Sequence, residues 1–479
     1  MRLRDFFVGL LILSWLPVAA AAPLDWQACH LPGQREALRC GRLAVPRDYA
    51  QAQAGTVEIH VAMAPAIRPR AEPDPLFVLA GGPGQAGSDL AALLDGAFAK
   101  VRASRDIVFI DQRGTGRSGR LACAPADDML ARSDSALEAD MLACLRGYGA
   151  GLLAYTTAAA AEDIEHLRQA VGAERINLWG GSYGTRLAQV YATRYPQQVR
   201  SLILDGVADA DLIIGADALE FEAALAALLQ RCADDTDCSR AFPTLAQQLQ
   251  TVLQKLDTSA TTASLPHPRD GAPLAAPISR QRLLMTVKYL LYSPQSAAQL
   301  PYLIARAAAD DWRPLLAAQA NSLDLAAAAP AEGLLLGITC REDWPRLDAA
   351  QRAQLAAAPI FGGSIAALDA LCGELALPAT GAASAPASAS AQSISAPSLL
   401  LSGALDPVTP PARAERALRQ LPHGQHLIAA GAGHIVSGLG CAPRLLRRFL
   451  DAPAAPLDGA CLADIALPAF QTSAAGTAP

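Results

Sequence analysis

The chain has 479 residues, of which 52% are hydrophobic and 18% charged, and its formal net charge at pH 7 is −6. Acidic and basic residues are mixed throughout without a lysine-rich or arginine-rich tract, which argues against nucleic acid as a partner. The length exceeds that of a usual single core, so we expect a core with a large insertion or a second domain.

Residues 1–21 have the layout of a secretory signal peptide. Two arginines precede an apolar stretch that ends in the small residues Ala19, Ala20 and Ala21, which fit the small-x-small cleavage rule. We expect cleavage after Ala21, although a retained membrane anchor would also fit the pattern. No later segment reaches the roughly 20 uninterrupted apolar residues of a membrane span. We therefore expect a secreted or periplasmic protein without stable membrane insertion after cleavage.

Ten cysteines follow the predicted signal peptide, and an even number in an exported chain suggests disulfides. We expect them to pair in sequence order, although spacing alone does not fix the connectivity and free buried thiols are the alternative. No pair of CxxC motifs occurs, so we expect no zinc site, no other metal ion and no cofactor. The expected pairs are Cys29 with Cys40, Cys123 with Cys144, Cys232 with Cys238, Cys340 with Cys372, and Cys441 with Cys461.

Two apolar runs in the first third of the chain end in glycine-rich loops. Residues 75–88, PLFVLAGGPGQAGS, and residues 105–119, RDIVFIDQRGTGRSG, each predict a strand followed by such a loop. Strands that are apolar throughout are typical of a parallel sheet covered by helices on both faces. In such sheets the chemistry gathers at the carboxyl ends of the strands, where Gly82 and Asp111 are expected to lie.

A G-x-S-x-G pattern surrounds Ser182 within residues 176–196, INLWGGSYGTRLAQVYATRYP. A short apolar strand precedes the pattern, and apolar residues recur at helical spacing after it until Pro196. This context predicts a nucleophile elbow, in which the serine lies at the tip of a strained strand-to-helix turn. The alternative is a glycine-rich turn with a helix-capping serine. The next apolar strand, VRSLILDGV at residues 199–207, carries Asp205 near its carboxyl end.

The chain then leaves the sheet pattern. The stretches ADALEFEAALAALLQRC and SRQRLLMTVKYLLY predict amphipathic helices, so we infer a helical lid over residues 207–396. Within it, residues 377–397 are of low complexity and are expected to form a loop without catalytic residues. Residues 22–206 and 397–465 are expected to form the two parts of the core, and residues 466–479 a disordered tail.

Two loops near the C-terminus supply candidate partners for Ser182. APSLLLSGALDPVTP predicts a strand followed by a turn that holds Asp406, and GQHLIAAGAGH predicts a strand followed by a loop that presents His434. In the α/β-hydrolase arrangement the triad follows the order serine, acid, histidine along the chain. The histidine would take the serine proton, and the carboxylate would hold the imidazole tautomer. Asp205 is the alternative carboxylate.

The chain has seven histidines, and only His434 is expected in the triad. His426 lies within a predicted strand and His423 in the turn before it. The other four are expected to be surface or packing residues: His30, His60, His166 and His267.

Two backbone N–H groups are expected to form an oxyanion hole. One belongs to Tyr183, directly after the nucleophile, and the other to Gly82 in the AGGPG loop. A glycine at that position lets the backbone approach the substrate carbonyl without an intervening side chain. The alternative for this loop is a plain tight turn.

The motifs GGPG, DQRGTGRS, GGSYGT, LDGV, SGALDPVTP and GAGH follow one another along the chain. Because of these motifs, the chain resembles the proline iminopeptidase and tripeptidyl aminopeptidase family of α/β-hydrolases. The resemblance is closest to the secreted, cysteine-containing tripeptidyl aminopeptidase branch, and it extends to the C-terminal region of that branch. The resemblance implies an α/β-hydrolase fold, with a mostly parallel central sheet, helices on both faces and an inserted helical lid domain. It also implies Ser182, Asp406 and His434 as the triad. One departure is Ala80, since cytoplasmic proline iminopeptidases carry histidine before GGPG.

Members of this family use lids to close over the free N-terminus of a peptide. Recognition of an ammonium group needs an acidic residue in a partly desolvated pocket. ITCREDWPRL, at residues 338–347, offers such residues next to Cys340, which a disulfide would hold in place. A solvated acidic turn with a packing tryptophan is the alternative. The candidates are Glu342, Asp343 and Trp344, followed by Glu220 and Glu222 on the first lid helix.

The leading expectation is therefore an exported serine exopeptidase, an aminopeptidase that releases residues or short peptides through an acyl-enzyme. Its partners would be peptide substrates with a free N-terminus. A carboxylesterase that uses the same triad on small esters is the first alternative, because fold and triad do not fix the acyl donor. A catalytically silent binding protein is the second.

Overall fold

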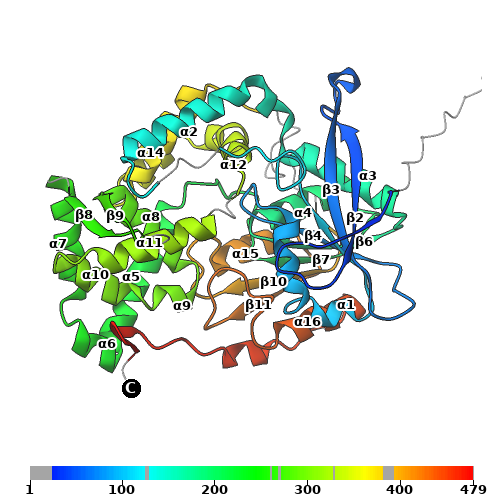
Figure 1. The fold of residues 1–479 in the computed structure, drawn as a ribbon. Coiled ribbons are helices and arrows are strands. Elements are labelled where there is room, and N and C mark those ends of the chain that lie inside the picture. Colours follow the sequence, from blue (N-terminus) through cyan, green and yellow to red (C-terminus); the bar gives the residue numbers. More distant parts are fainter. Residues whose placement is uncertain are drawn as a thin grey trace, which may run out of the picture.

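A computed structural model of the chain describes residues 24–123, 129–258, 261–267, 271–326, 330–380 and 393–477. The predicted signal peptide and most of the low-complexity segment lie outside these ranges. A nine-stranded sheet in the order β1-β2-β3-β5-β4-β6-β7-β10-β11 forms the core (Figure 1). Its strands are β1 (Gln27–Cys29), β2 (Leu38–Pro46), β3 (Thr56–Ala64), β4 (Leu76–Leu79), β5 (Ile107–Ile110), β6 (Ile176–Gly181), β7 (Val199–Asp205), β10 (Ser398–Gly403) and β11 (Gly424–Ala429).

The sheet is mostly parallel, as predicted. From β5 to β11 the strands pair in parallel, and β1, β2 and β3 add an antiparallel edge. Side chains on β4 alternate between the two faces: Phe77 packs with helices α3 (Thr157–Val171) and α4 (Tyr183–Arg194), and Val78 with α16 (Ala442–Asp451). Because helices cover both faces of the sheet, its strands are apolar throughout, and these apolar runs allowed the strands to be predicted from the sequence.

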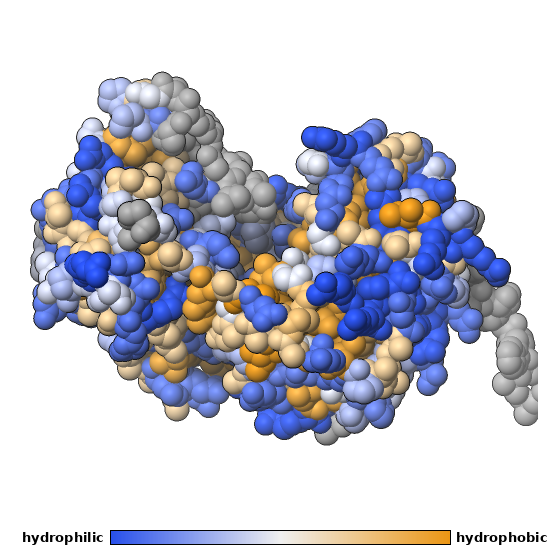
Figure 2. Space-filling view, turned by 90° about the horizontal axis from the view of Figure 1, so that it is seen from below, coloured by the Kyte–Doolittle hydropathy of each residue, from blue (hydrophilic) through white to orange (hydrophobic). Residues whose placement is uncertain are grey.

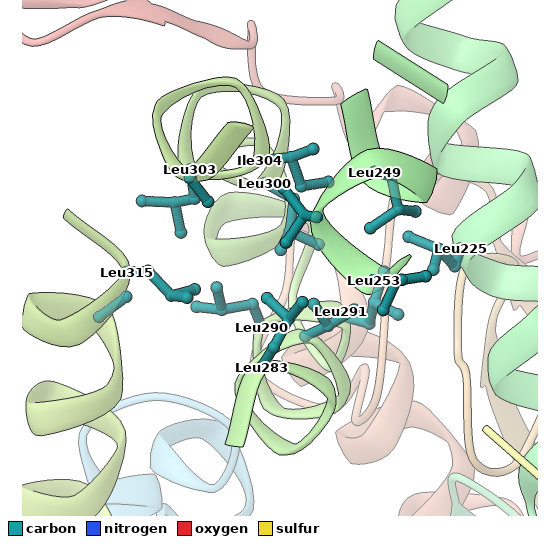
Figure 3. Close-up of a cluster of buried hydrophobic side chains, with 14 of the residues drawn as sticks. Leu225, Leu249, Leu253, Leu283, Leu290, Leu291, Leu300, Leu303, Ile304 and Leu315 are labelled. Carbon is teal, nitrogen blue, oxygen red and sulfur yellow. The ribbon is translucent and has the colours of Figure 1, made fainter. Parts of the chain in front are cut away.

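A lid with its own hydrophobic core is inserted between β7 and β10, on the left of Figure 1. Its apolar side chains come mainly from α5, α7, α8, α10 and α11, and Leu225, Leu253 and Leu291 lie among them (Figure 3). The lid helices are α5 (Ala218–Asp234), α6 (Thr236–Ala241), α7 (Leu245–Thr258), α8 (Arg280–Leu291), α9 (Pro294–Ala297), α10 (Leu300–Ala308), α11 (Arg313–Ala326), α12 (Glu332–Ile338), α13 (Ala349–Ala356) and α14 (Gly363–Leu375).

The lid differs from the predicted all-helical insertion in two ways. Strands β8 (Thr261–Pro266) and β9 (Pro273–Ile278) form an antiparallel hairpin within it. In addition, α2 (Asp134–Tyr148), which belongs to the N-terminal part of the core in sequence, packs against lid helix α14 (Figure 1). The lid is therefore built from segments on both sides of the nucleophile.

All ten cysteines are joined in disulfides, in sequence order. The bond between Cys340 and Cys372 ties the acidic turn of the lid to α14, and the bond between Cys123 and Cys144 ties α2 to the loop after β5. Disulfides of this number are typical of proteins in an oxidising compartment. Within the described ranges, no helix is long and apolar enough to cross a membrane.

The segment that follows the core, expected as a disordered tail, is folded onto the lid as far as residue 477. Phe470 is only 4% exposed and belongs to the lid core, and the backbone N–H of Gln471 donates to the carbonyl of Ala298 at 3.0 Å. Short strands β12 (Gln471–Ser473) and β13 (Gly476–Thr477) follow. Seen from below, apolar residues gather in the middle of the molecule, between the lid on the left and the N-terminal strands on the right (Figure 2).

Candidate active site

Ser182 occupies the strained turn that the sequence predicts. It lies between β6 and α4 with φ 55° and ψ −124°, and its side chain makes no helix-capping hydrogen bond. An added Cβ at Gly180 would lie 2.4 Å from the carbonyl oxygen of Gly184, and one at Gly184 would lie 2.1 Å from that of Leu79. Strand and helix can approach this closely only because both positions are glycine. The geometry is that of a nucleophile elbow.

The acid and histidine loops meet beside the elbow. Strands β6, β7, β10 and β11 are neighbours in the sheet, so their carboxyl ends lie side by side. His434 Nδ1 lies 2.8 Å from Asp406 Oδ2. An added Cβ at Gly181, next to the nucleophile, would lie 3.4 Å from Ile435 Cδ1, next to the histidine. The structure thus pairs Asp406 with His434 and places the loop of His434 against the turn of Ser182, and the action of the three residues as a triad stays a prediction.

Asp406 is held as an ionised carboxylate. Its oxygens accept hydrogen bonds from the backbone N–H groups of Val408 and Thr409, both at 2.9 Å, and from Thr409 Oγ1 at 2.7 Å. Burial alone would raise the pKa of Asp406, but the neighbouring His434 and these hydrogen bonds hold the pKa below its usual range. Burial alone would lower the pKa of His434. The carboxylate of Asp406 has the larger effect, so the pKa of His434 is raised. A carboxylate paired in this way would stabilise an imidazolium, as the predicted role of His434 requires.

Asp205, the alternative carboxylate, holds the histidine loop instead. Its two oxygens accept the backbone N–H groups of Val436 at 2.8 Å and Ser437 at 2.7 Å. These bonds hold the two residues directly after Ile435, whose φ of 73° is rare for a β-branched residue and is maintained by the contacts around it. Burial raises the pKa of Asp205. Asp205 therefore positions His434 through the backbone.

The glycine-rich loop after β4 packs directly against the nucleophile. An added Cβ at Gly81 would lie 2.9 Å from Ser182 Cβ, and Gly82, the predicted oxyanion donor, follows with φ 102°. The lid reaches the same loop, since the N–H of Ala331 donates to the carbonyl of Gly84 at 2.9 Å. The close approach of Gly81 brings this loop against the turn of Ser182, and the roles of Gly82 and Tyr183 as oxyanion donors stay predictions.

Replacement of Gly81 by alanine is expected to lower kcat by about 10²–10³-fold, the cost of a lost oxyanion donor. The new Cβ would collide with Ser182 Cβ and with the carbonyl oxygen of Gly181, both at 2.9 Å, and would push the loop away from the oxyanion. Gly96→Ala, where an added Cβ meets nothing within 4 Å, is the matched control. Equal kcat values for the two variants would contradict this role of the loop.

Asp111, noted in the sequence only for its place after a strand, fixes the two loops behind the oxyanion residues. It accepts the backbone N–H groups of Ser88 at 2.8 Å and Arg117 at 3.0 Å, and it lies 3.0 Å from His60 Nδ1. His60 is 3% exposed, so the expectation of a packing histidine fits it. The DQRGTGRS motif places Asp111 at the carboxyl end of a strand, but the motif does not reveal which backbone N–H groups Asp111 binds.

The acidic turn of the lid is buried, so the alternative of a solvated turn is wrong. Glu342 is 3% and Asp343 0% exposed. Glu342 Oε1 accepts the backbone N–H of Thr157 at 2.8 Å, and Oε2 accepts Thr157 Oγ1 at 2.6 Å. Thr157 Oγ1 also lies 2.8 Å from the hydroxyl of Tyr183, the residue after the nucleophile. Burial raises the pKa of Glu342 to about 7.

The other candidates for binding an ammonium group have partners elsewhere in the protein. Asp343 pairs with the buried Arg186 at 2.8 Å, and Trp344 Nε1 donates to Asp369 at 2.8 Å. Glu220 pairs with Arg413, and Glu222 accepts the backbone N–H of Phe361 at 3.0 Å. Among the described residues, hydrogen bonds through Thr157 link Glu342 to Tyr183 in the nucleophile turn.

A lid residue that the sequence did not single out contacts His434, the predicted catalytic histidine. The ring of Tyr292 packs edge-on against the imidazole of His434, with ring centroids 5.3 Å apart. The carbonyl of Tyr292 accepts the backbone N–H of His434 at 2.8 Å. Nothing in the residue pattern marks Tyr292, because the contact depends on how the lid docks on the core.

Comparison with known proteins places these features in context. A family model described as the α/β hydrolase fold matches residues 74–440. A tripeptidyl aminopeptidase of Streptomyces lividans is 30% identical over 212 residues, which make up 40% of this chain and 39% of that protein. Serine protease Hip1 of Mycobacterium tuberculosis is 29% identical over 225 residues, 42% of each protein. The match thus spans about two fifths of the length of these curated relatives. A solved proline iminopeptidase of Mycobacterium smegmatis aligns over 86% of this chain and 98% of its own, with 16% identity and a TM-score of 0.39.

Proposed function

The chain belongs to the α/β-hydrolase family, and on that premise we propose that it is an exported serine exopeptidase that removes residues or short peptides from free N-termini. The similarity to a tripeptidyl aminopeptidase and to a serine protease supports peptides as the substrate class. The five disulfides support export, because disulfides persist in oxidising compartments.

The proposed reaction proceeds through an acyl-enzyme. Ser182 Oγ attacks the scissile carbonyl while His434 Nε2 takes its proton, and the backbone N–H groups of Gly82 and Tyr183 donate to the developing oxyanion. The imidazolium then protonates the leaving amine, and water hydrolyses the ester. Asp406 keeps the Nδ1 proton of His434 in place throughout.

The buried carboxylate of Glu342 is the observation that carries the exopeptidase proposal. Each of its oxygens accepts one hydrogen bond from Thr157, and an ionised carboxylate has about four acceptor sites, so capacity remains for an ammonium group. The link through Thr157 to Tyr183 keeps this carboxylate at a fixed place relative to the nucleophile turn. A fixed distance between an ammonium site and the nucleophile would set how much of the N-terminus is released.

Glu342→Gln should remove the preference for free over N-acetylated peptide anilides, which we expect to be about a hundredfold or more in the unmodified protein. The substitution can keep both hydrogen bonds, because the glutamine oxygen can accept from the Thr157 N–H while its NH₂ donates to Thr157 Oγ1. Only the charge is lost. The measurement is the ratio of kcat/KM for the two anilides.

Two controls accompany that ratio. Glu374→Gln removes an exposed lid carboxylate that pairs with Arg146 and should leave the ratio unchanged. Labelling of Ser182 by a fluorophosphonate should proceed at the unmodified rate in Glu342→Gln, since this reagent has no ammonium group. A preference that survives Glu342→Gln would contradict the role of Glu342; a protein that cleaves both anilides equally, or only small esters, would be a carboxylesterase instead.

The preference for free N-termini is also expected to depend on pH. Because burial raises the pKa of Glu342 to about 7, the carboxylate is protonated and neutral below that pH, and the preference should decline as the pH falls through 7. It should decline again above about 8, where the α-amino group of the substrate loses its proton. Glu342→Gln should flatten the lower limb, and a lower limb unchanged in that variant would contradict the assignment.

A further inference from the structure

Lid helix α8 is apolar on two opposite faces. On one face, Leu283 and Leu290 belong to the buried lid core (Figure 3). On the other face three large apolar side chains reach solvent: Met285 is 61%, Tyr289 40% and Tyr292, directly after the helix, 39% exposed. An ordinary surface helix would carry polar residues on that face. Single exposed apolar residues are common, but three on one face indicate a binding surface.

We call Met285, Tyr289 and Tyr292 the α8 strip. Their spacings of four and three residues place them one after another along one side of the helix. The ring centroids of Tyr289 and Tyr292 are 6.5 Å apart. At 1.5 Å per residue the strip is about 10 Å long, a length that an extended peptide covers with about three residues.

One end of the α8 strip contacts the candidate active site. The exposed ring of Tyr292 packs edge-on against the imidazole of His434, with centroids 5.3 Å apart. Phe221 of α5 packs against the same ring, with centroids 6.3 Å apart, so the position of Tyr292 is fixed from the lid. Near the start of α8, Gln281 donates to Glu138 of α2 at 3.1 Å. The strip therefore runs from His434 towards α2.

The cation nearest to the α8 strip in sequence is neutralised by the lid. Lys288 pairs with Asp217 at 2.6 Å, and its ammonium group lies 4.6 Å from the ring centroid of Phe221. The flexible thioether of Met285 and the flat tyrosine rings suit apolar side chains of different shapes. The strip is therefore suited to an apolar peptide segment.

We propose that the α8 strip binds apolar side chains on the leaving side of the substrate, in the residues that follow the scissile bond. This inference rests on the proposed exopeptidase function. In that mechanism His434 protonates the leaving amine, so the leaving segment starts beside His434, where the strip also starts. The free N-terminus would lie at Glu342, so the two sites would bind different parts of one peptide.

Two peptides test the expected preference. They share a free N-terminus and all residues up to the first bond cleaved, which mass spectrometry of the products locates. The next three residues are leucine in one peptide and serine in the other. The unmodified protein should have a kcat/KM about tenfold or more higher for the leucine peptide. Equal values would overturn the inference and leave the exopeptidase proposal standing, whereas cleavage of neither peptide would overturn both.

The double variant Met285→Ser, Tyr289→Ser locates the preference on α8. The ratio of kcat/KM for the leucine and serine peptides should fall close to one, because apolar contact area is lost on two turns of the helix. Tyr292 stays unchanged in this variant because it contacts His434. Ile67→Ser removes an apolar side chain of the core that is 70% exposed and should keep the original ratio. A ratio that survives in the double variant would overturn the assignment.

Tyr289→Glu provides a second test, because a damaged protein does not gain a preference. A third peptide carries lysine in the three residues after the scissile bond. In this variant kcat/KM for the lysine peptide, relative to the serine peptide, should rise about two- to fivefold. The gain should vanish at about 1 M salt, which screens exposed charge pairs. An unchanged ratio for these two peptides would overturn the proposal.

Discussion

Replacement of Ser182 by alanine is expected to lower kcat by about 10⁶-fold and to abolish labelling by a fluorophosphonate. The serine lies at φ 55° in the elbow, where its hydroxyl takes no part in helix capping and is the reacting group of the proposed mechanism. Because its side chain makes no capping bond, the fold should be unchanged, which circular dichroism can verify.

His434→Ala should lose a similar factor, since serine and histidine act as one unit. The double variant should consequently be no slower than either single variant. Intact-protein mass spectrometry should find one fluorophosphonate label on the unmodified protein, located on the peptide that contains Ser182. Ser135→Ala, which alters an exposed serine on α2, is the control. Labelling of Ser182→Ala at an unchanged rate would contradict the assignment of the nucleophile.

Asp406→Asn is expected to lower kcat by about 10⁴-fold without unfolding the protein. The asparagine oxygen can keep the two backbone bonds from Val408 and Thr409, which both reach Oδ1. Its NH₂ then faces Nδ1 of His434 and donates to it. The imidazole proton must move to Nε2, and a protonated Nε2 cannot accept the proton of Ser182.

Asp205→Asn is the control for Asp406→Asn. It removes a second carboxylate near His434 without changing the group that faces Nδ1 of the imidazole. Both oxygens of Asp205 accept backbone N–H groups, so one bond to the loop must be lost in the amide. We expect the free energy of unfolding to fall by about 1–3 kcal/mol, with a much smaller loss of kcat than in Asp406→Asn. Urea denaturation and steady-state kinetics measure the two quantities. A larger loss of kcat in Asp205→Asn would exchange the roles of the two carboxylates.

The sequence allowed the triad and the sheet to be predicted because both rest on local patterns. Ser182, Asp406 and His434 each follow an apolar strand, and the carboxyl ends of neighbouring parallel strands meet at one edge. The family match over residues 74–440 confirms the predicted fold. The disulfide pairing also follows the predicted order, since each bond closes a short loop.

The features that were not predicted depend on how distant segments dock. Glu342 is buried because α3 presents the N–H of Thr157 to it, a contact across 185 residues of sequence. The tail is folded because Phe470 packs into the lid core. The composition of the tail does not reveal this contact. Arg231 lies in an ordinary amphipathic helix, and only the packing around it shows that its Nε and Nη2 atoms have no hydrogen-bond partner within the described part of the chain.

The most direct test of the exopeptidase proposal is mass spectrometry of the products from one decapeptide, supplied with a free and with an acetylated N-terminus. The account predicts that the free peptide loses residues or short fragments from its N-terminus in steps, and that the acetylated peptide stays intact over the same time. Equal cleavage of both peptides, or cleavage of neither while small esters are hydrolysed through Ser182, would contradict it.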